Sequence, residues 1–224
     1  MSIQSLIIQT VQFKPPADAV LRLTVKAVNS SDAPVCEPLV CEIDGDKNAR
    51  FDFGNVVLSG GQAKLFTRDF RYKPTVVWRA GSGGLLTMTA RLRDLELSAR
   101  FGIRTVARKD GLLLINNEPL DPRSNGFPPE CRLADGSVRP LTLDALAPDI
   151  NDRLDDCDSL GLPAFIILPV VSGESADVKR AVLRIMDAFA NRPSVIGWLI
   201  PGGLSDNALS GYRLAVALDP FRLS

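Results

Sequence analysis

Two carboxylates, Glu130 and Glu174, hold the positions in this chain best suited to acid–base chemistry. Glu174 follows an apolar run at residues 165–171, which predicts a strand buried on both faces. Glu130 lies in a loop that follows an earlier predicted strand. Because the carboxyl ends of parallel strands meet at one edge of a sheet, the two side chains could lie at the same end. The simpler interpretation, that both are ordinary surface carboxylates, stays open.

The chain contains no histidine, which removes the usual general base near neutral pH and the commonest metal ligand. Catalysis of the Ser-His-Asp or Cys-His type is therefore excluded. No pair of cysteines has the C-x-x-C spacing of zinc or dithiol redox sites, so we expect no metal and no cofactor. We expect reduced thiols, with Cys36 and Cys41 on opposite faces of one strand. The four cysteines are Cys36, Cys41, Cys131 and Cys157.

The bulk composition excludes several classes of partner. Lysine plus arginine and aspartate plus glutamate number 26 each, so the net charge gives no reason to expect nucleic acid or an anionic membrane surface. The chain has no run of 18 apolar residues, so no membrane-spanning helix is predicted. The start at Met1–Leu6 has neither a basic segment nor a long apolar core, so no signal peptide is visible. This favours the cytoplasm, although the compartment stays unknown.

Residues 1–107 have the pattern of an all-β domain. Residues 20–28 alternate apolar and polar side chains, and residues 29–34 have the composition of a turn. Seven or eight short strands at this spacing predict a sandwich of the immunoglobulin type. A short strand is expected at 75–78, with Trp78 as a core aromatic packed between the sheets.

Residues 108–224 have a different pattern, in which strands and helices alternate as in a parallel sheet. The expected order is a hairpin at 112–120, an irregular loop at 121–140, the start of a helix at 142–147, a helix at 149–160, a strand at 165–168, a helix from 175, a strand at 195–200 and a helix at 207–218. An acidic cluster on the helix at 149–160 is interpreted as a solvated face, since calcium would require a loop. Its members are Asp152, Asp155, Asp156 and Asp158.

Several motifs resemble those of family 2 glycoside hydrolases, the β-galactosidase and β-glucuronidase group. They are Phe101-Gly102-Ile103-Arg104, Leu114-Ile115-Asn116-Asn117-Glu118-Pro119, Cys157-Asp158-Ser159-Leu160-Gly161-Leu162-Pro163, Arg192-Pro193-Ser194-Val195-Ile196-Gly197-Trp198 and Asp219-Pro220-Phe221-Arg222. The first two resemble the junction at which a β-sandwich precedes a (β/α)₈ barrel. The resemblance implies an immunoglobulin-like sandwich at 1–107 followed by a truncated glycosidase-barrel-like α/β region at 108–224.

The barrel is expected to be incomplete. A (β/α)₈ barrel needs at least roughly 200 residues, and residues 112–224 are far fewer. The resemblance makes 166–169 the third barrel strand and 195–200 the fourth. It leaves the segment between the first and third strands without a counterpart, and the chain ends where the fifth strand would begin.

The resemblance also places the family's catalytic positions. The Asn-Glu pair that carries the acid/base falls at Gly202 and Gly203, and the nucleophile would lie beyond residue 224. Retaining glycosidases need two carboxyl groups about 5–5.5 Å apart, and glycine has no proton to give. Glu174 and Glu130 are the substitutes that can be named. Asn125, which resembles a family Asn near the sugar, and Trp198 are the candidate ligand-binding residues.

Three hypotheses remain open. The chain could be a non-catalytic relative, or pseudoenzyme, that binds carbohydrate or a protein partner. In that case we expect a homo-oligomer or a partner chain to cover the open half-barrel. Alternatively, it could be an active glycosidase of the β-galactosidase or β-glucuronidase kind that uses Glu174 and Glu130. Finally, it could be an inactive fragment of a longer gene product.

Overall fold

The computed structural model describes residues 1–120, 131, 139–168, 175–199 (175–179 as backbone only), 213, 216, 217 and 219–223. The chain divides into two compact units. The first comprises residues 1–76 and 86–101, and the second comprises 77–85 and 102–224. In the described parts of both units, no helix is long and apolar enough to cross a bilayer.

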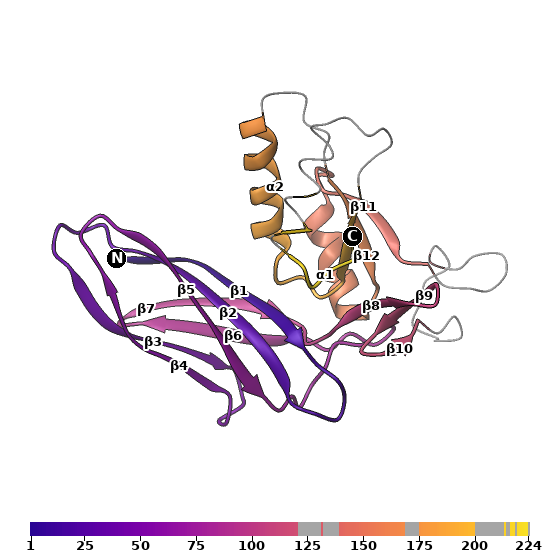
Figure 1. The fold of residues 1–224 in the computed structure, drawn as a ribbon, viewed down its shortest axis with the longest axis horizontal. Helices are drawn as coiled ribbons and strands as arrows, with labels where there is room; N and C mark the ends of the chain where they lie inside the picture. The colour runs from indigo at the N-terminus through magenta and orange to yellow at the C-terminus, as the bar shows by residue number, and fades with distance from the viewer. Residues whose placement is uncertain are drawn as a thin grey trace. The chain divides into compact units, whose positions relative to one another are not determined.

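The first unit is a sandwich of seven antiparallel strands, as predicted (Figure 1). One sheet has the order β1-β2-β5, with β1 at Ser2–Gln12, β2 at Ala19–Val28 and β5 at Ala63–Tyr72. The other has the order β4-β3-β6-β7, with β3 at Val35–Ile43, β4 at Arg50–Leu58, β6 at Leu86–Leu92 and β7 at Leu95–Phe101.

Alternation along the strands determines the core of the sandwich. Leu21, Leu23 and Val25 on β2 are fully buried, and the residues between them face outward. On β3, Cys36 is exposed and Cys41 is buried, which confirms that they lie on opposite faces. Burial raises the pKa of the Cys41 thiol to about 12, so this sulfur is an unreactive part of the core.

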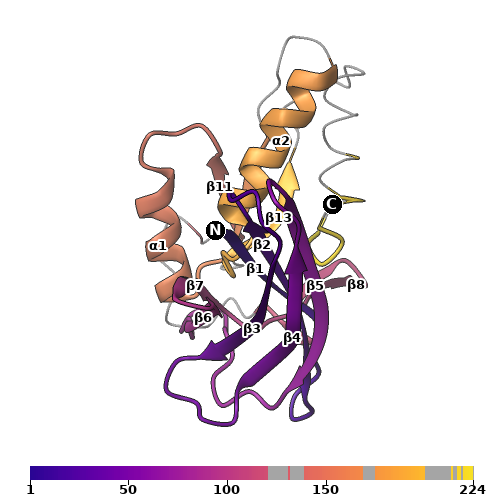
Figure 2. The same cartoon turned by 90° about the vertical axis from the view of Figure 1, so that its left-hand side faces the viewer.

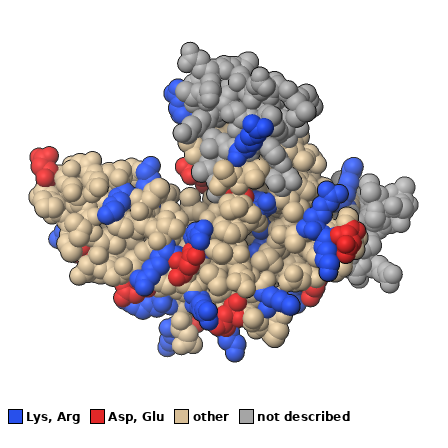
Figure 3. All heavy atoms as spheres, in the orientation of Figure 1, with Lys and Arg blue, Asp and Glu red and all other residues tan. Residues whose placement is uncertain are grey.

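The edge strand β5 carries two exposed cations on the side of the sheet that β2 buries. Lys64 pairs in register with the buried Ala27, and its Nζ lies 5.3 Å from the ring centre of Phe66. Arg68 Cζ lies 5.4 Å from the ring centre of Phe70. Charges on an edge strand oppose pairing with another chain. Cationic and anionic side chains are also interspersed over the described surface drawn in Figure 3.

The second unit begins with a small antiparallel sheet of order β10-β9-β8. Its strands are β8 at Val106–Lys109, β9 at Leu112–Ile115 and β10 at Glu118–Pro119. Asn116 and Asn117 form the tight turn between β9 and β10 with φ values of 54° and 66°. Asparagine tolerates this left-handed conformation better than most residues, and the predicted hairpin is confirmed.

A three-stranded parallel sheet of order β11-β12-β13 follows (Figures 1 and 2). Its elements are β11 at Leu141–Asp144, α1 at Ile150–Leu160, β12 at Ala164–Ile167, α2 at Ser175–Phe189 and β13 at Val195–Leu199. Both helices connect parallel strands, which is the arrangement predicted from the alternating pattern. The helix predicted at 207–218 falls largely outside the described residues.

Strand β11 corrects two predictions. Residues 142–147 were expected to start a helix, but Leu141–Asp144 pairs with β12 in parallel register. The segment between the first and third strands was expected to have no counterpart, which is wrong for its strand, because β11 precedes β12 in the chain and pairs with it. The physical reason is tertiary: Leu143 is fully buried in the core, and the backbone of β11 bonds to a strand that is itself buried.

The two faces of this sheet differ. One face packs on α1 and α2 in an apolar cluster that includes Leu143, Ile166 and Trp198, which lie side by side in the strand register. The opposite face, called here the open face, is half-buried or exposed at its strand positions, except at Gly197, which is buried. The open face consists of Thr142, Asp144, Phe165, Ile167, Gly197 and Leu199.

The outer edge of β13 is paired by Leu223. The Leu223 N–H donates to the Ile196 carbonyl at 2.8 Å, and the Trp198 N–H donates to the Leu223 carbonyl at 3.2 Å. This parallel bridge brings residue 223 beside Gly197. It extends the open face by one further backbone position.

Candidate functional site

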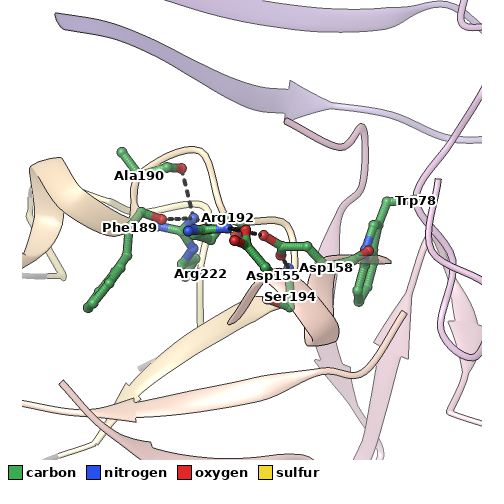
Figure 4. A network of polar contacts seen from close by, with 8 residues as sticks. All are labelled: Trp78, Asp155, Asp158, Phe189, Ala190, Arg192, Ser194 and Arg222. Atoms are coloured by element: carbon green, nitrogen blue, oxygen red, sulfur yellow. Dashed lines mark hydrogen bonds and ion pairs between the residues drawn. The ribbon is translucent and has the colours of Figure 1, made fainter. Parts of the chain in front are cut away.

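A buried carboxylate, Asp158, organises the amino ends of the parallel strands (Figure 4). Its Oδ1 accepts the Ser194 N–H at 2.9 Å, and its Oδ2 lies 3.1 Å from Arg192 Nη1. Its backbone carbonyl accepts the Trp78 Nε1–H at 2.9 Å. One residue at the end of α1 thus holds the turn before β13 and the loop at 77–85.

The acidic cluster of α1 is therefore only partly a solvated face. Asp152 and Asp156 are exposed, as expected. Asp155 pairs with Arg192, and Asp158 is only 2% exposed. The sequence did contain the signal, because Asp158 follows the buried Leu154 by four residues and so shares its face of the helix.

The predicted role of Trp78 between the sandwich sheets is wrong. Trp78 is fully buried in the second unit, and residues 75–78 form no strand. Glycines allow the loop at 77–85 to approach α1: a Cβ added at Gly83 would lie 2.2 Å from the Ser159 carbonyl oxygen. A Cβ at Gly161 would lie 2.2 Å from the Arg79 carbonyl oxygen. This close backbone contact places the indole at the end of the helix.

Two buried arginines converge on one carbonyl group. Arg104 Nη2 and Arg222 Nε each donate to the Val195 carbonyl at 2.6 Å. Arg222 also donates to the carbonyls of Phe189, Ala190 and Arg192, and forms an ion pair with Asp219. Together they fix the segment from the end of α2 to the start of β13, as Figure 4 shows for Arg222.

Burial sets the electrostatics of this pair. Removal from water, and to a smaller extent the positive charge of Arg222, lowers the pKa of Arg104 to about 9. The negative charges of Asp219 and Asp158 raise the pKa of Arg104 and so offset part of this effect. Arg104 is thus still a cation at neutral pH, and the carbonyl groups at the start of β13 stabilise its charge.

The carboxyl ends of the strands are the other candidate location, since barrel chemistry occurs there. Five positions singled out from the sequence lie outside the described residues: Asn125, Glu130, Glu174, Gly202 and Gly203. Trp198 is described and is 1% exposed in the helix-covered cluster. Its Nε1–H finds no acceptor among the described residues, and Arg222 Cζ lies 5.5 Å from its ring centre. A ligand role for Trp198 stays a prediction.

Three residues of the open face were not predicted from the sequence to face outward from a strand. Asp144 is exposed at the last position of β11, Thr142 is exposed two residues before it, and Phe165 is half-buried on β12. Residues 141–144 alternate apolar and polar side chains with a period of two, which is the signal that could have revealed the strand and its outward-facing groups.

The sandwich has a polar hollow of about 570 Å³, and its carboxylates already have partners. Glu42 forms ion pairs with Arg50 and Arg91. Asp44 accepts the Thr89 hydroxyl, and Asp46 accepts the Tyr72 hydroxyl at 3.0 Å. These contacts tie the strand ends to the turn that follows β3 and indicate a structural role.

No family model and no curated protein matches the chain. Solved structures do match. A β-galacturonidase of glycoside hydrolase family 2 from Eisenbergiella tayi matches 99% of this chain and 45% of its own, with 18% identity and a TM-score of 0.75. The β-glucuronidase of Bacteroides uniformis matches 98% of this chain and 32% of its own, with 18% identity and a TM-score of 0.69. The exo-chitosanase CsxA of Amycolatopsis orientalis matches 99% of this chain and 31% of its own, with 19% identity and a TM-score of 0.71.

The fold is that of glycoside hydrolase family 2. The likeness covers nearly all of this chain, while the chain spans less than half the length of these relatives. Three residues that carry the sequence resemblance, Arg104, Asp158 and Arg222, meet at the amino ends of the strands. In (β/α)₈ barrels that end contributes to stability. The motifs that resemble family 2 therefore stabilise the fold of the second unit.

Proposed function

We propose that this chain is a non-catalytic relative of family 2 glycosidases, which uses the fold as a scaffold to bind carbohydrate or a protein partner. One observation carries the proposal. The recognisable motif residues stabilise the amino ends of the strands, whereas glycine stands at position 203, where the resemblance places the acid/base. A glycosidase without a proton donor loses the step that releases its leaving group.

The parallel sheet supports the second part of the proposal. Parallel sheets are almost always enclosed, because their strands are apolar on both faces and at both edges. Strand β11 pairs with β12 alone among the described strands, so its other edge has no strand partner in the part of the chain that the structure describes. We therefore propose a second copy or a partner chain at this edge. Light scattering should give a mass above 24.2 kDa, and a stable monomer would contradict it.

The alternative is an active glycosidase that uses Glu174 and Glu130. The solved relatives named as glycosidases favour it only through their shared fold. It predicts turnover of aryl β-galactosides or β-glucuronides. An inactive fragment of a longer product is the third reading, and the coding sequence after codon 224 would reveal the missing strands.

An assay at high protein concentration distinguishes the first two functions. The chain is incubated with nitrophenyl β-galactoside, β-glucuronide, β-galacturonide and β-glucosaminide, beside Glu174→Gln and Glu130→Gln variants. We expect release of nitrophenol at the buffer rate from all three proteins. Turnover that is present in the unmodified chain and lost in a Gln variant would establish the enzyme and overturn the proposal.

A further inference from the structure

We propose that the outer edge of β5, in the sandwich, binds an extended acidic segment of a partner chain as an added strand. The segment would carry carboxylates four residues apart with an apolar residue midway between them, so that all three side chains lie on one face. This inference goes beyond the proposed function, because it concerns the first unit and holds whether or not the second unit catalyses a reaction.

Strand β5 is the last strand of its sheet. It pairs with β2 in continuous register over Ala63–Tyr72, and its other edge has no strand partner among the described strands. Strand β4 is likewise the last strand of the other sheet. A long edge of this kind offers a row of N–H and C=O groups with which an extended peptide can pair. Addition of a strand is therefore the mode of recognition that suits β5.

The side chains along this edge alternate between cations and aromatic rings. Lys64, Phe66, Arg68 and Phe70 each pair in register with a fully buried residue of β2. The two cations are exposed, and the two rings are half-buried. Phe53 of β4 is also half-buried, and its ring centre lies 5.3 Å from that of Phe70. These five residues, called here the cationic margin, present apolar ring surface and positive charge side by side.

The charge of the cationic margin has no partner among the described residues. No ion pair there includes Lys64 or Arg68. Asp69 pairs with Arg22, and the side chain of Asp52 accepts a backbone N–H at 2.6 Å. The two cations lie instead over rings of β5, at 5.3 and 5.4 Å from the ring centres. An acidic segment would supply carboxylates to both cations.

The alternation along β5 determines the sequence of the partner. Side chains on one face of paired strands contact the residues opposite them, and successive ones are two residues apart. Lys64 and Arg68 are four residues apart with Phe66 between them, so the partner needs two carboxylates at the same spacing around an apolar residue. Exposed ion pairs contribute little singly, so backbone pairing and ring contact must add to them.

The same charges disfavour a second copy of this chain at the margin. Two β5 strands placed edge to edge would bring cations against cations, which opposes their pairing. An acidic strand would meet attraction at the same positions. The cationic margin therefore fits a partner of opposite charge.

Binding of synthetic peptides tests the inference. The probe has the sequence Glu-Thr-Val-Thr-Glu-Thr-Val with blocked ends and a fluorophore, and its binding to the full chain is followed by fluorescence anisotropy. We expect saturable binding that is at least about tenfold tighter than that of the same peptide with lysine in place of glutamate. A peptide of the same composition with adjacent glutamates places them on opposite faces and should bind at least about threefold more weakly.

Reversal of the charges tests the surface. Lys64→Glu combined with Arg68→Glu should weaken the acidic peptide by at least about tenfold and strengthen the lysine peptide by a similar factor. Lys14→Glu combined with Lys26→Glu makes the same change in net charge outside the margin. This matched control should leave the affinity for both peptides within about threefold. All four side chains are exposed, so circular dichroism should show that both double variants are folded.

Methylation of the peptide backbone tests strand addition. Alternate N–H groups of a strand point to opposite edges, so methylation of the threonine nitrogens blocks one edge, and methylation of the glutamate and valine nitrogens blocks the other. We expect one of the two methylated peptides to bind at least about tenfold more weakly and the other to keep its affinity.

Several results would overturn the inference. They are absence of binding by the acidic peptide, equal binding by the lysine peptide, unchanged binding after the Lys64 and Arg68 reversal, and equal effects of the two methylation patterns. A reversal that changes the mass in light scattering would make the margin an interface between copies, which also excludes the acidic partner. None of these results affects the non-catalytic scaffold, which the hydrolysis assay tests.

Discussion

The two ends of the parallel sheet are built on different principles. At the amino end, Arg104, Arg222 and Asp158 are buried and hold backbone groups from segments far apart in the sequence. At the carboxyl end, Asp144 and Leu199 are exposed and Phe165 is half-buried. The polar groups of the amino end form hydrogen bonds and ion pairs within the chain, while those of the carboxyl end are exposed to solvent.

This difference shows which end of the sheet carries the motifs that resemble family 2. The motifs visible in the sequence belong to the end that stabilises the fold, so a chain can keep them without keeping a reaction. Variants at the amino end should therefore lower the free energy of unfolding, and variants at the carboxyl end should leave it nearly unchanged. The chain's two tryptophans, Trp78 and Trp198, both lie in the second unit, so their fluorescence reports its unfolding.

The largest effect is expected for Arg222→Ala. The change leaves the Asp219 carboxylate buried without its partner and removes donors from four carbonyl groups. We expect the free energy of unfolding to fall by about 3–5 kcal/mol. Urea unfolding monitored by tryptophan fluorescence measures this change. Arg222→Lys should lose less, because it keeps the charge opposite Asp219. Arg108→Ala on the exposed face of β8 is the matched control, and an equal loss there would contradict the account.

Asp158→Ala should have the next largest effect. It removes the acceptor of the Ser194 N–H and the partner of the half-buried Arg192. The expected loss is about 2–3 kcal/mol in the same unfolding experiment. Asp156→Ala, on the exposed side of the same helix, should change the free energy of unfolding by less than about 0.5 kcal/mol. Equal losses from both variants would mean that Asp158 does not anchor the amino end.

Alkaline pH should lower the free energy of unfolding because thiols are buried in the folded chain. Burial raises the pKa of Cys41 and of Cys157 to about 12, from an ordinary value of 9.0. Between these values the unfolded chain releases protons that the folded chain retains, so stability falls as pH rises. We expect about 1.4 kcal/mol per pH unit for each thiol above pH 9. Cys41→Ala should flatten the slope measured by circular dichroism, while Cys36→Ala, at an exposed position, should leave it unchanged.

The smallest effect on stability is expected at the carboxyl end. Asp144→Asn preserves the shape of an exposed side chain and can still accept the Leu146 N–H. Its free energy of unfolding should stay within about 0.5 kcal/mol of the unmodified chain. A loss comparable to that of Asp158→Ala would remove the contrast between the two ends.

Much of the fold could be predicted because local sequence patterns determine many of its elements. The alternation along residues 20–28, the turn at Asn116 and Asn117, and the apolar strand at 164–167 each determine their structure from neighbouring residues. The general resemblance to family 2 then supplied the order of the elements, and the solved structures agree with it.

The remaining features depend on partners distant in the sequence. Trp78 bonds to Asp158, 80 residues away, so no local pattern could place its indole in the second unit. Strand β11 has only four residues and gains its stability from pairing with β12. The candidate site depended on single positions, and the glycine at 203, where the resemblance places the acid/base, does not show what the chain binds.

One measurement tests the central contrast most directly. A methyl β-D-glucosaminide sample is held with a stoichiometric amount of the full chain for a day and followed by NMR. The account predicts that the anomeric signal of the glycoside stays intact throughout. Free reducing sugar that accumulates in proportion to the protein concentration would contradict it, because the carboxyl end would then carry out the chemistry that we infer it has lost.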